Sequence, residues 1–185
     1  MIKKHAVYLS IALLVAPLVV SADDMVVAPV SPVQMALLQL PQSCPALATA
    51  VDAQQQALLQ AFYQAQNDQM VWADLGRVAA LKAALAQLAD DGLNPAHYPL
   101  PVGQDLCADI GTSQQYLKAL HDLHFGRLSQ SRYEPVWHSD SVVAPDRQAE
   151  LLALAVPGVQ DVSAAFERAR PAFEQYQNLV FLYHA

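Results

Sequence analysis

Apolar residues recur at every third or fourth position along most of the chain, which is the spacing of an amphipathic α-helix. The clearest stripe consists of Val78, Leu81, Leu85 and Leu88. Asp74 precedes this stripe and is a residue type that caps helix N-termini, while Gly92 follows it and is a residue type that ends helices. The pattern therefore predicts a helix between Asp74 and Gly92.

The same period predicts further helices in the rest of the chain. One begins at Pro45, and its inward positions are Leu47, Val51, Leu58, Leu59 and Phe62. The others are expected at about residues 104–124, 146–155, 161–169 and from 171 onward. Gly111 weakens the middle of the longest one. Since no segment shows the two-residue alternation of a strand, we predict an all-α fold, an irregular bundle of about six helices.

The segment 129–146 interrupts this helical pattern. It follows Gly126, which ends the preceding helix, and it contains Pro135, Pro145 and several serines. Residues of these types favour loops over regular structure. We predict a loop here, with Trp137 as the side chain that anchors it.

The N-terminus has the features of a secretory signal peptide. Lys3 and Lys4 supply positive charge, residues 9–20 are almost entirely apolar, and the small residues Ser21 and Ala22 follow. This order is typical of a leader that is removed after export. We therefore predict a cleaved signal peptide at residues 1–22 and a periplasmic protein. The alternative is an uncleaved N-terminal anchor, which the short apolar length disfavours.

The remaining chain divides into a tether and a domain. Residues 23–43 contain Pro29, Pro32 and Pro41, a spacing that opposes long helices. We predict a proline-containing tether at 23–43, of which the apolar stretch 35–40 can pack on the domain. Residues 44–185 are then the helical domain.

The charge of the protein excludes one class of partner. Removal of the leader leaves eight basic residues against seventeen acidic ones, and the basic residues do not cluster. An acidic surface of this kind repels nucleic acids and anionic membranes. We expect no nucleic-acid partner, and membrane contact only through the leader during export.

The two cysteines, Cys44 and Cys107, are predicted to form a disulfide. An even number of cysteines favours a disulfide in an oxidising compartment. Cys44 precedes the first predicted helix and Cys107 lies in the first turn of the third, so a bundle can bring both to the same end. The alternative is two buried free thiols.

Several short motifs together resemble a known family. They are Phe62-Tyr63 followed by Trp72, the string Asp91-Gly92-Leu93-Asn94-Pro95-Ala96-His97-Tyr98, the string Asp122-Leu123-His124-Phe125-Gly126-Arg127-Leu128, then Trp137, and finally Pro171 with Tyr176 and Leu179. In order and spacing, from about Ala46 to the last residue, the chain resembles the N-terminal helical scaffold domain of the large multidomain L,D-transpeptidases of Gram-negative bacteria. Those enzymes cross-link peptidoglycan.

The chain departs from that family in two ways. Gln66 and Met70 occupy positions where the family usually has a basic residue and a proline. The Ser-His-Gly-Cys motif of the catalytic domain is also absent, and neither Cys44 nor Cys107 has neighbours that would activate a thiol. We therefore expect no enzymatic activity and no cofactor. The helical pattern runs to the last residue, so we expect either a truncated member of the family or a short paralogue.

Four groups of polar or aromatic residues are candidate sites. The turn at 91–98 could bind a partner, but turn chemistry explains its residues, with Gly92 at positive φ, Leu93 packing back and Tyr98 covering the core. His121, His124 and His138 are too few to favour a metal site.

The remaining candidates are Arg127 and the aromatic residues. Arg127 after Gly126 could bind a carboxylate of a neighbouring domain or an acid group of peptidoglycan, but a bond to its own helix end or to Asp122 is favoured. A sugar-stacking platform could be formed by Trp72, Trp137, Tyr63 and Tyr133. We expect these aromatic side chains to pack in the core instead.

The predicted function is that of a non-catalytic periplasmic scaffold domain associated with peptidoglycan cross-linking and cell-wall assembly. Its expected partners are an L,D-transpeptidase catalytic domain or other cell-wall synthesis proteins. One alternative is a stand-alone adaptor or folding helper, which predicts an exposed apolar groove. A small secreted helical enzyme such as a chorismate mutase is disfavoured, because its dianionic substrate requires clustered cations.

Overall fold

A computed structural model describes residues 30–127, 147–176, 178 and 182 of the protein. Every regular element in this part of the chain is a helix, so the predicted all-α fold is confirmed. The predicted signal peptide, residues 23–29 of the predicted tether, and the predicted loop with Trp137 lie outside the described residues. No helix in the described part is long and apolar enough to cross a membrane.

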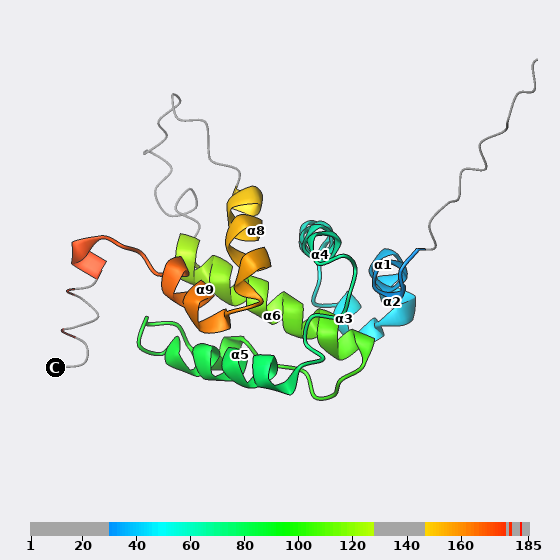
Figure 1. Ribbon diagram of the computed structural model, residues 1–185, viewed down its shortest axis with the longest axis horizontal. Helices are drawn as coiled ribbons and strands as arrows, with labels where there is room; N and C mark the ends of the chain where they lie inside the picture. The colour runs from blue at the N-terminus through cyan, green and yellow to red at the C-terminus, as the bar shows by residue number, and fades with distance from the viewer. Residues whose placement is uncertain (1–29, 128–146, 177, 179–181, 183–185) are drawn as a thin grey trace, which may run out of the picture.

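The fold is built around one long helix, α6 (Leu106–Phe125), which crosses the molecule with α5 along one side and α4 and α8 on the other (Figure 1). Asp105 caps its N-terminus, and Gly126 follows it with φ of 80°. Gly111 permits a close approach, because a Cβ there would lie 3.1 Å from Leu47 Cδ2 and 3.2 Å from Pro101 Cγ. The glycine predicted to weaken this helix therefore also makes room for its neighbours.

The helix predicted between Asp74 and Gly92 is present as α5 (Leu75–Gln87). The Asp74 carboxylate accepts hydrogen bonds from the backbone N–H groups of Gly76 and Arg77, as expected of an N-cap. The chain then continues through turns to Gly92, which has φ of 75°. A short 3₁₀ helix, η1 (Pro95–His97), follows.

The helix predicted to begin at Pro45 is instead divided into two. The first piece is α3 (Pro45–Ala48), and the second is α4 (Ala53–Ala65). Asp52 and Gln55 form a reciprocal capping box between them, which satisfies the backbone N–H groups at a new helix start. This local capping explains why the apolar period does not continue as one helix.

The second half of the predicted tether at 23–43 is mostly helical, and its apolar stretch 35–40 packs on the domain as expected. Residues there form α1 (Pro32–Leu38) and α2 (Leu40–Ser43), and their buried side chains are Val33, Ala36, Leu37 and Leu40. Pro32 and Pro41 stand in the first turns of these helices, where a missing N–H costs nothing. Since α1 packs against α4, the packed domain begins before residue 44.

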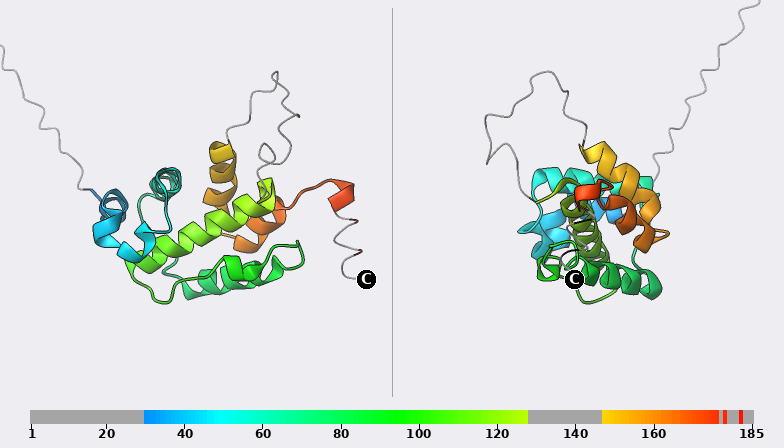
Figure 2. Two further views of the ribbon diagram at one scale, coloured as in Figure 1. Left: turned by 180° about the vertical axis from the view of Figure 1, so that it is seen from behind. Right: turned by 90° about the vertical axis from the view of Figure 1, so that its left-hand side faces the viewer.

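Two further helices pack against α6 and against each other, and Figure 2 shows them from behind. They are α8 (Arg147–Gly158) and α9 (Val162–Ala169), the latter capped by Asp161 and close to the predicted range 161–169. Pro157 lies inside α8, which therefore extends beyond the predicted end at 155, and the predicted first residue, Asp146, lies outside the described residues. Of the helix predicted from 171 onward, residues 171–173 are not helical, whereas residues 174–176, 178 and 182 are helical, so the helix begins three residues later than predicted.

The predicted disulfide is present. Cys44 and Cys107 are bonded, with their Cα atoms 5.5 Å apart and 63 residues between them in sequence. The bond joins the end of α2 to the first turn of α6, and Cys44 is buried. It therefore fixes the N-terminal helices to one end of the central helix.

Candidate functional site

The Phe62-Tyr63 and Trp72 motif residues meet at a buried carboxylate on α6. Asp109, 3% exposed, accepts hydrogen bonds from Tyr63 Oη at 2.5 Å, Val71 N at 3.1 Å and Trp72 N at 2.6 Å. These contacts tie the start of α6 to the end of α4 and to the segment before α5. Sequence reasoning did not identify Asp109, although it is a charged residue next to inward-facing Ile110 of the predicted helix.

Ser113, one turn further along α6, completes this network. Its Oγ accepts from Trp72 Nε1 at 2.9 Å and lies 2.8 Å from Tyr63 Oη. Burial raises the pKa of Tyr63 well above its usual value, and the adjacent Asp109 carboxylate adds to the effect. Because Tyr63 and Trp72 are buried in this network, neither offers a face to a sugar. Trp137 and Tyr133, the other proposed platform residues, lie outside the described part.

The string at 91–98 folds as the predicted turn. Gly92 has positive φ, and Leu93 N donates to Leu88 O at 2.9 Å. The Asn94 side chain caps η1, which begins at Pro95. Tyr98 is 2% exposed and packs in the core. The sequence thus contained enough information to predict this turn, because each residue type satisfies a local backbone requirement.

Arg127 joins this turn to the end of α6. Its Nη1 lies 2.7 Å from His97 Nδ1, and its Nε lies 3.8 Å from Asp122 Oδ2. Tyr98 Oη donates to the same Asp122 carboxylate at 2.9 Å. Burial raises the pKa of Tyr98, and the bond to Asp122 raises it further. The predicted contact between Arg127 and Asp122 is therefore present, and the Arg127 side chain is half-exposed. The two motif strings, 91–98 and 122–128, meet here in one cluster.

Asp91 connects the same turn to the segment after α9. Its side chain is 2% exposed and accepts from Arg170 Nε at 2.9 and 3.1 Å and from Tyr176 Oη at 2.5 Å. We refer to Asp91, Arg170 and Tyr176 as the Asp91 clasp. Burial and the Asp91 carboxylate both raise the pKa of Tyr176. The clasp brings together motif residues 85 positions apart, and sequence reasoning did not anticipate it.

The histidines considered for a metal site have separate partners. His124 lies 3.1 Å from Ala169 O through Nδ1 and 2.9 Å from Glu150 Oε1 through Nε2. His121 Nδ1 lies 3.3 Å from Asp122 Oδ1. In the part of the chain that the structure describes, no three His, Cys, Asp or Glu side chains gather as metal ligands would. His138 lies outside that part.

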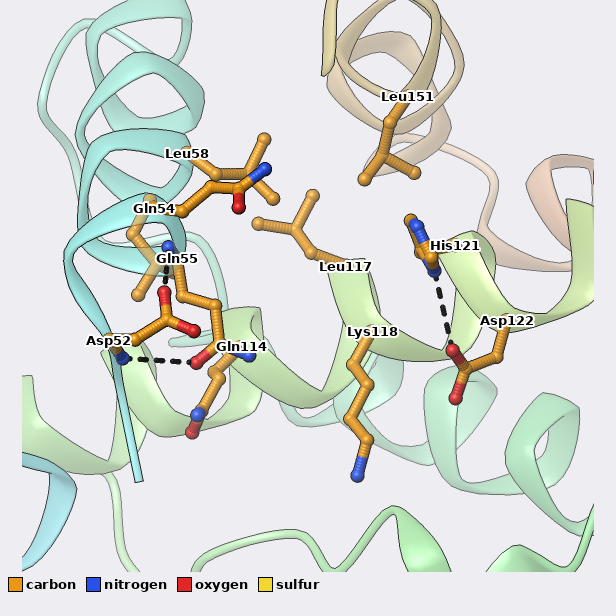
Figure 3. Close-up of a pocket in the computed structure, with 11 residues that line it drawn as sticks. Asp52, Gln54, Gln55, Leu58, Gln114, Leu117, Lys118, His121, Asp122 and Leu151 are labelled. Carbon is orange, nitrogen blue, oxygen red and sulfur yellow. Dashed lines mark hydrogen bonds and ion pairs between the residues drawn. The ribbon is translucent and has the colours of Figure 1, made fainter. Parts of the chain in front are cut away.

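A hollow of about 330 Å³ opens between α4, α6 and α8 (Figure 3). It is lined by Asp52, Gln54, Gln55, Leu58, Leu59, Gln114, Leu117, Lys118, His121, Asp122 and Leu151. Its base is aliphatic and its edges are polar, as is usual for sites that bind small ligands. Sequence reasoning did not predict this hollow, because residues from three separate helices form it.

These observations define an all-α domain whose motif residues bond to one another and to residues outside the motifs, such as Asp109 and Arg170. Its two cysteines are joined in a disulfide. Residues 57–180 match the family model described as the Scaffold domain, and the chain belongs to that family. The resemblance expected from the sequence is thereby confirmed. No curated protein and no solved structure matches the chain.

Proposed function

We propose that this chain is a non-catalytic periplasmic scaffold that holds an L,D-transpeptidase catalytic domain in position for peptidoglycan cross-linking. Its membership of the Scaffold domain family supports the scaffold role. The expected periplasmic location rests on the leader-like residues 1–22 and is compatible with the Cys44–Cys107 disulfide.

The Asp91 clasp is the observation that carries the proposal. The clasp joins residues after α9 to the turn at 91–98. The buried Asp91 carboxylate binds both Arg170 and Tyr176, so it sets the direction in which the chain leaves α9. Charge-assisted bonds of this kind are short and directional. A scaffold requires such a fixed geometry, whereas a catalytic site requires polar groups that remain available to a substrate.

An exposed aromatic residue beside the clasp is suited to contact a partner. Phe173 is 58% exposed, and its ring centroid lies 5.9 Å from that of Tyr176. Aromatic side chains held in place by a rigid neighbour are common anchors of protein interfaces. The face around Phe173 is therefore the part of the described surface that we assign to the catalytic partner.

Calorimetric titration of the disulfide-bonded chain with an isolated L,D-transpeptidase catalytic domain tests the proposal. We expect saturable binding, which Phe173→Ala weakens roughly fivefold or more, as for an interface anchor. Val102→Ala is the matched control, because Val102 is a fully exposed apolar residue elsewhere on the surface. Absence of binding at about 100 μM, a concentration well above micromolar dissociation constants, would refute the proposed partner.

One observation favours a second candidate, a stand-alone adaptor. That function predicts an exposed apolar groove, and the hollow between α4, α6 and α8 has an aliphatic base. The hollow offers little to a dianionic substrate of the chorismate mutase type. Lys118 is the lysine of its lining, and its Nζ already donates to His97 O at 2.9 Å.

A further inference from the structure

The hollow between α4, α6 and α8 has a base suited to one aliphatic side chain. Leu59, Leu117 and Leu151 line it and are almost fully buried, while Leu58 at its edge is partly exposed. Its volume, about 330 Å³, is at the small end of the range for ligand sites. The hollow is therefore large enough for one branched apolar group and its immediate neighbours, but not for a bulky ligand.

Two polar side chains stand on either side of this base. Figure 3 shows the Gln54 amide reaching across from α4 and the His121 ring approaching from α6, with Leu117 between them. Among the described residues, neither the Gln54 amide nor His121 Nε2 has a hydrogen-bond partner, whereas His121 Nδ1 lies near Asp122. An amide side chain supplies both a hydrogen-bond donor and an acceptor, and an imidazole nitrogen acts as one or the other. These groups fit the N–H and C=O of a peptide backbone.

The charged residues of the lining are already engaged. Asp52 Oδ1 accepts from Gln55 N at 2.8 Å, and Asp122 accepts from Tyr98 Oη. Lys118 Nζ donates to His97 O and lies 5.3 Å from the centroid of the Tyr98 ring. The lining groups without a partner among the described residues include the Gln54 amide, His121 Nε2, Gln55 Nε2 and Gln114 Oε1. Because these are amide and imidazole groups, the contacting part of the ligand is expected to be uncharged.

From these observations we propose that the hollow is a binding site for an extended, uncharged peptide segment. One aliphatic side chain of the segment enters between Leu58, Leu117 and Leu151. The flanking peptide groups bond to the Gln54 amide and to His121 Nε2. This site lies on α4, α6 and α8, apart from the Phe173 face proposed above for the catalytic domain, so each proposal can fail without the other.

Titration of the ¹⁵N-labelled, disulfide-bonded protein with N-acetyl-glycyl-leucyl-glycinamide, followed by NMR, tests the site. We expect saturable shifts, with a dissociation constant in the millimolar range for so small a probe, that centre on Gln54, Leu58, His121 and Leu151. N-acetyl-glycyl-glycyl-glycinamide, which lacks the aliphatic side chain, should give no saturable shifts. Equal responses to the two peptides, or no saturation by either at about 20 mM, would overturn the proposal.

Two glutamine variants on the same helix make the test specific. Gln54→Ala should weaken binding roughly threefold or more, as expected when one hydrogen bond to the ligand is lost. Gln64 is also exposed on α4 but does not line the hollow, so Gln64→Ala should leave binding unchanged. Equal weakening by both variants would contradict the assignment of Gln54. Stronger saturable shifts with N-acetylglucosamine than with the leucine peptide would replace the peptide by a sugar as the ligand.

Discussion

Replacing Asp109 by asparagine tests the buried network that holds the start of α6. Asp109 accepts three hydrogen bonds through two carboxylate oxygens, and all three donors are buried. Asparagine keeps the shape but offers only one oxygen. Its NH₂ group must therefore face either the Trp72 N–H or the donors of Tyr63 and Val71, which places one donor against another.

The size of the effect follows from these contacts. A hydrogen bond to a charged group contributes about 1.5–3 kcal/mol, and a buried donor left without an acceptor costs about 1–3 kcal/mol. Since some of the three bonds to Asp109 survive, we expect the variant to lose about 2–4 kcal/mol of unfolding free energy. With a urea slope of about 1–3 kcal/mol per molar, this loss lowers the unfolding midpoint by roughly 1–2 M.

The same substitution at Asp52 is the matched control. Asp52 is an exposed N-cap of α4, and asparagine caps helices about as well as aspartate. Asp52→Asn should therefore change the unfolding free energy by less than about 0.5 kcal/mol. If Asp109→Asn also stays within about 0.5 kcal/mol of the unmodified protein in urea unfolding followed by far-UV circular dichroism, the structural role assigned to Asp109 is refuted.

Three further predictions concern packing, the disulfide and pH. Gly158→Ala would place a methyl carbon 2.5 Å from Tyr116 Oη, so we expect a loss of about 1–3 kcal/mol in thermal or urea unfolding; an unchanged midpoint would contradict this. Removing the Cys44–Cys107 bond by double serine substitution should cost about 4 kcal/mol, and denatured, unreduced protein should show no alkylated thiol by mass spectrometry. Burial raises the pKa of Tyr63 and of Tyr116, so the folded state keeps protons that the unfolded state releases above about pH 10; stability should be constant below that pH and fall above it. A constant unfolding midpoint from pH 8 to 11 would oppose this last prediction.

Local patterns in the sequence were sufficient to predict the helices that have a clear apolar stripe and a recognisable cap. The α5 helix after Asp74 is an example. The turn at 91–98 was predictable for the same reason, because each of its residues meets a requirement of the neighbouring backbone. The N-terminal helices are hard to predict from the sequence, because proline breaks a helix interior but is compatible with the first turn, where Pro32 and Pro41 lie.

The tertiary contacts of the candidate sites could not be predicted in this way. The Asp91 carboxylate meets Arg170 across 79 residues and Tyr176 across 85, and no local pattern indicates which distant donor a buried carboxylate will meet. The hollow likewise requires the relative placement of α4, α6 and α8. The disulfide was predictable, because the chain contains just two cysteines and both precede or begin predicted helices.

Incubation of the disulfide-bonded chain with tetrapeptide-containing muropeptides, analysed by mass spectrometry, tests most directly whether this protein is a scaffold and not a cross-linking enzyme. An active L,D-transpeptidase catalytic domain serves as the positive control. We expect no new cross-linked product from the chain alone, because Cys44 and Cys107 are joined to each other and neither is a thiol. A cross-linked product that disappears when Cys44 and Cys107 are replaced by serine would contradict the account.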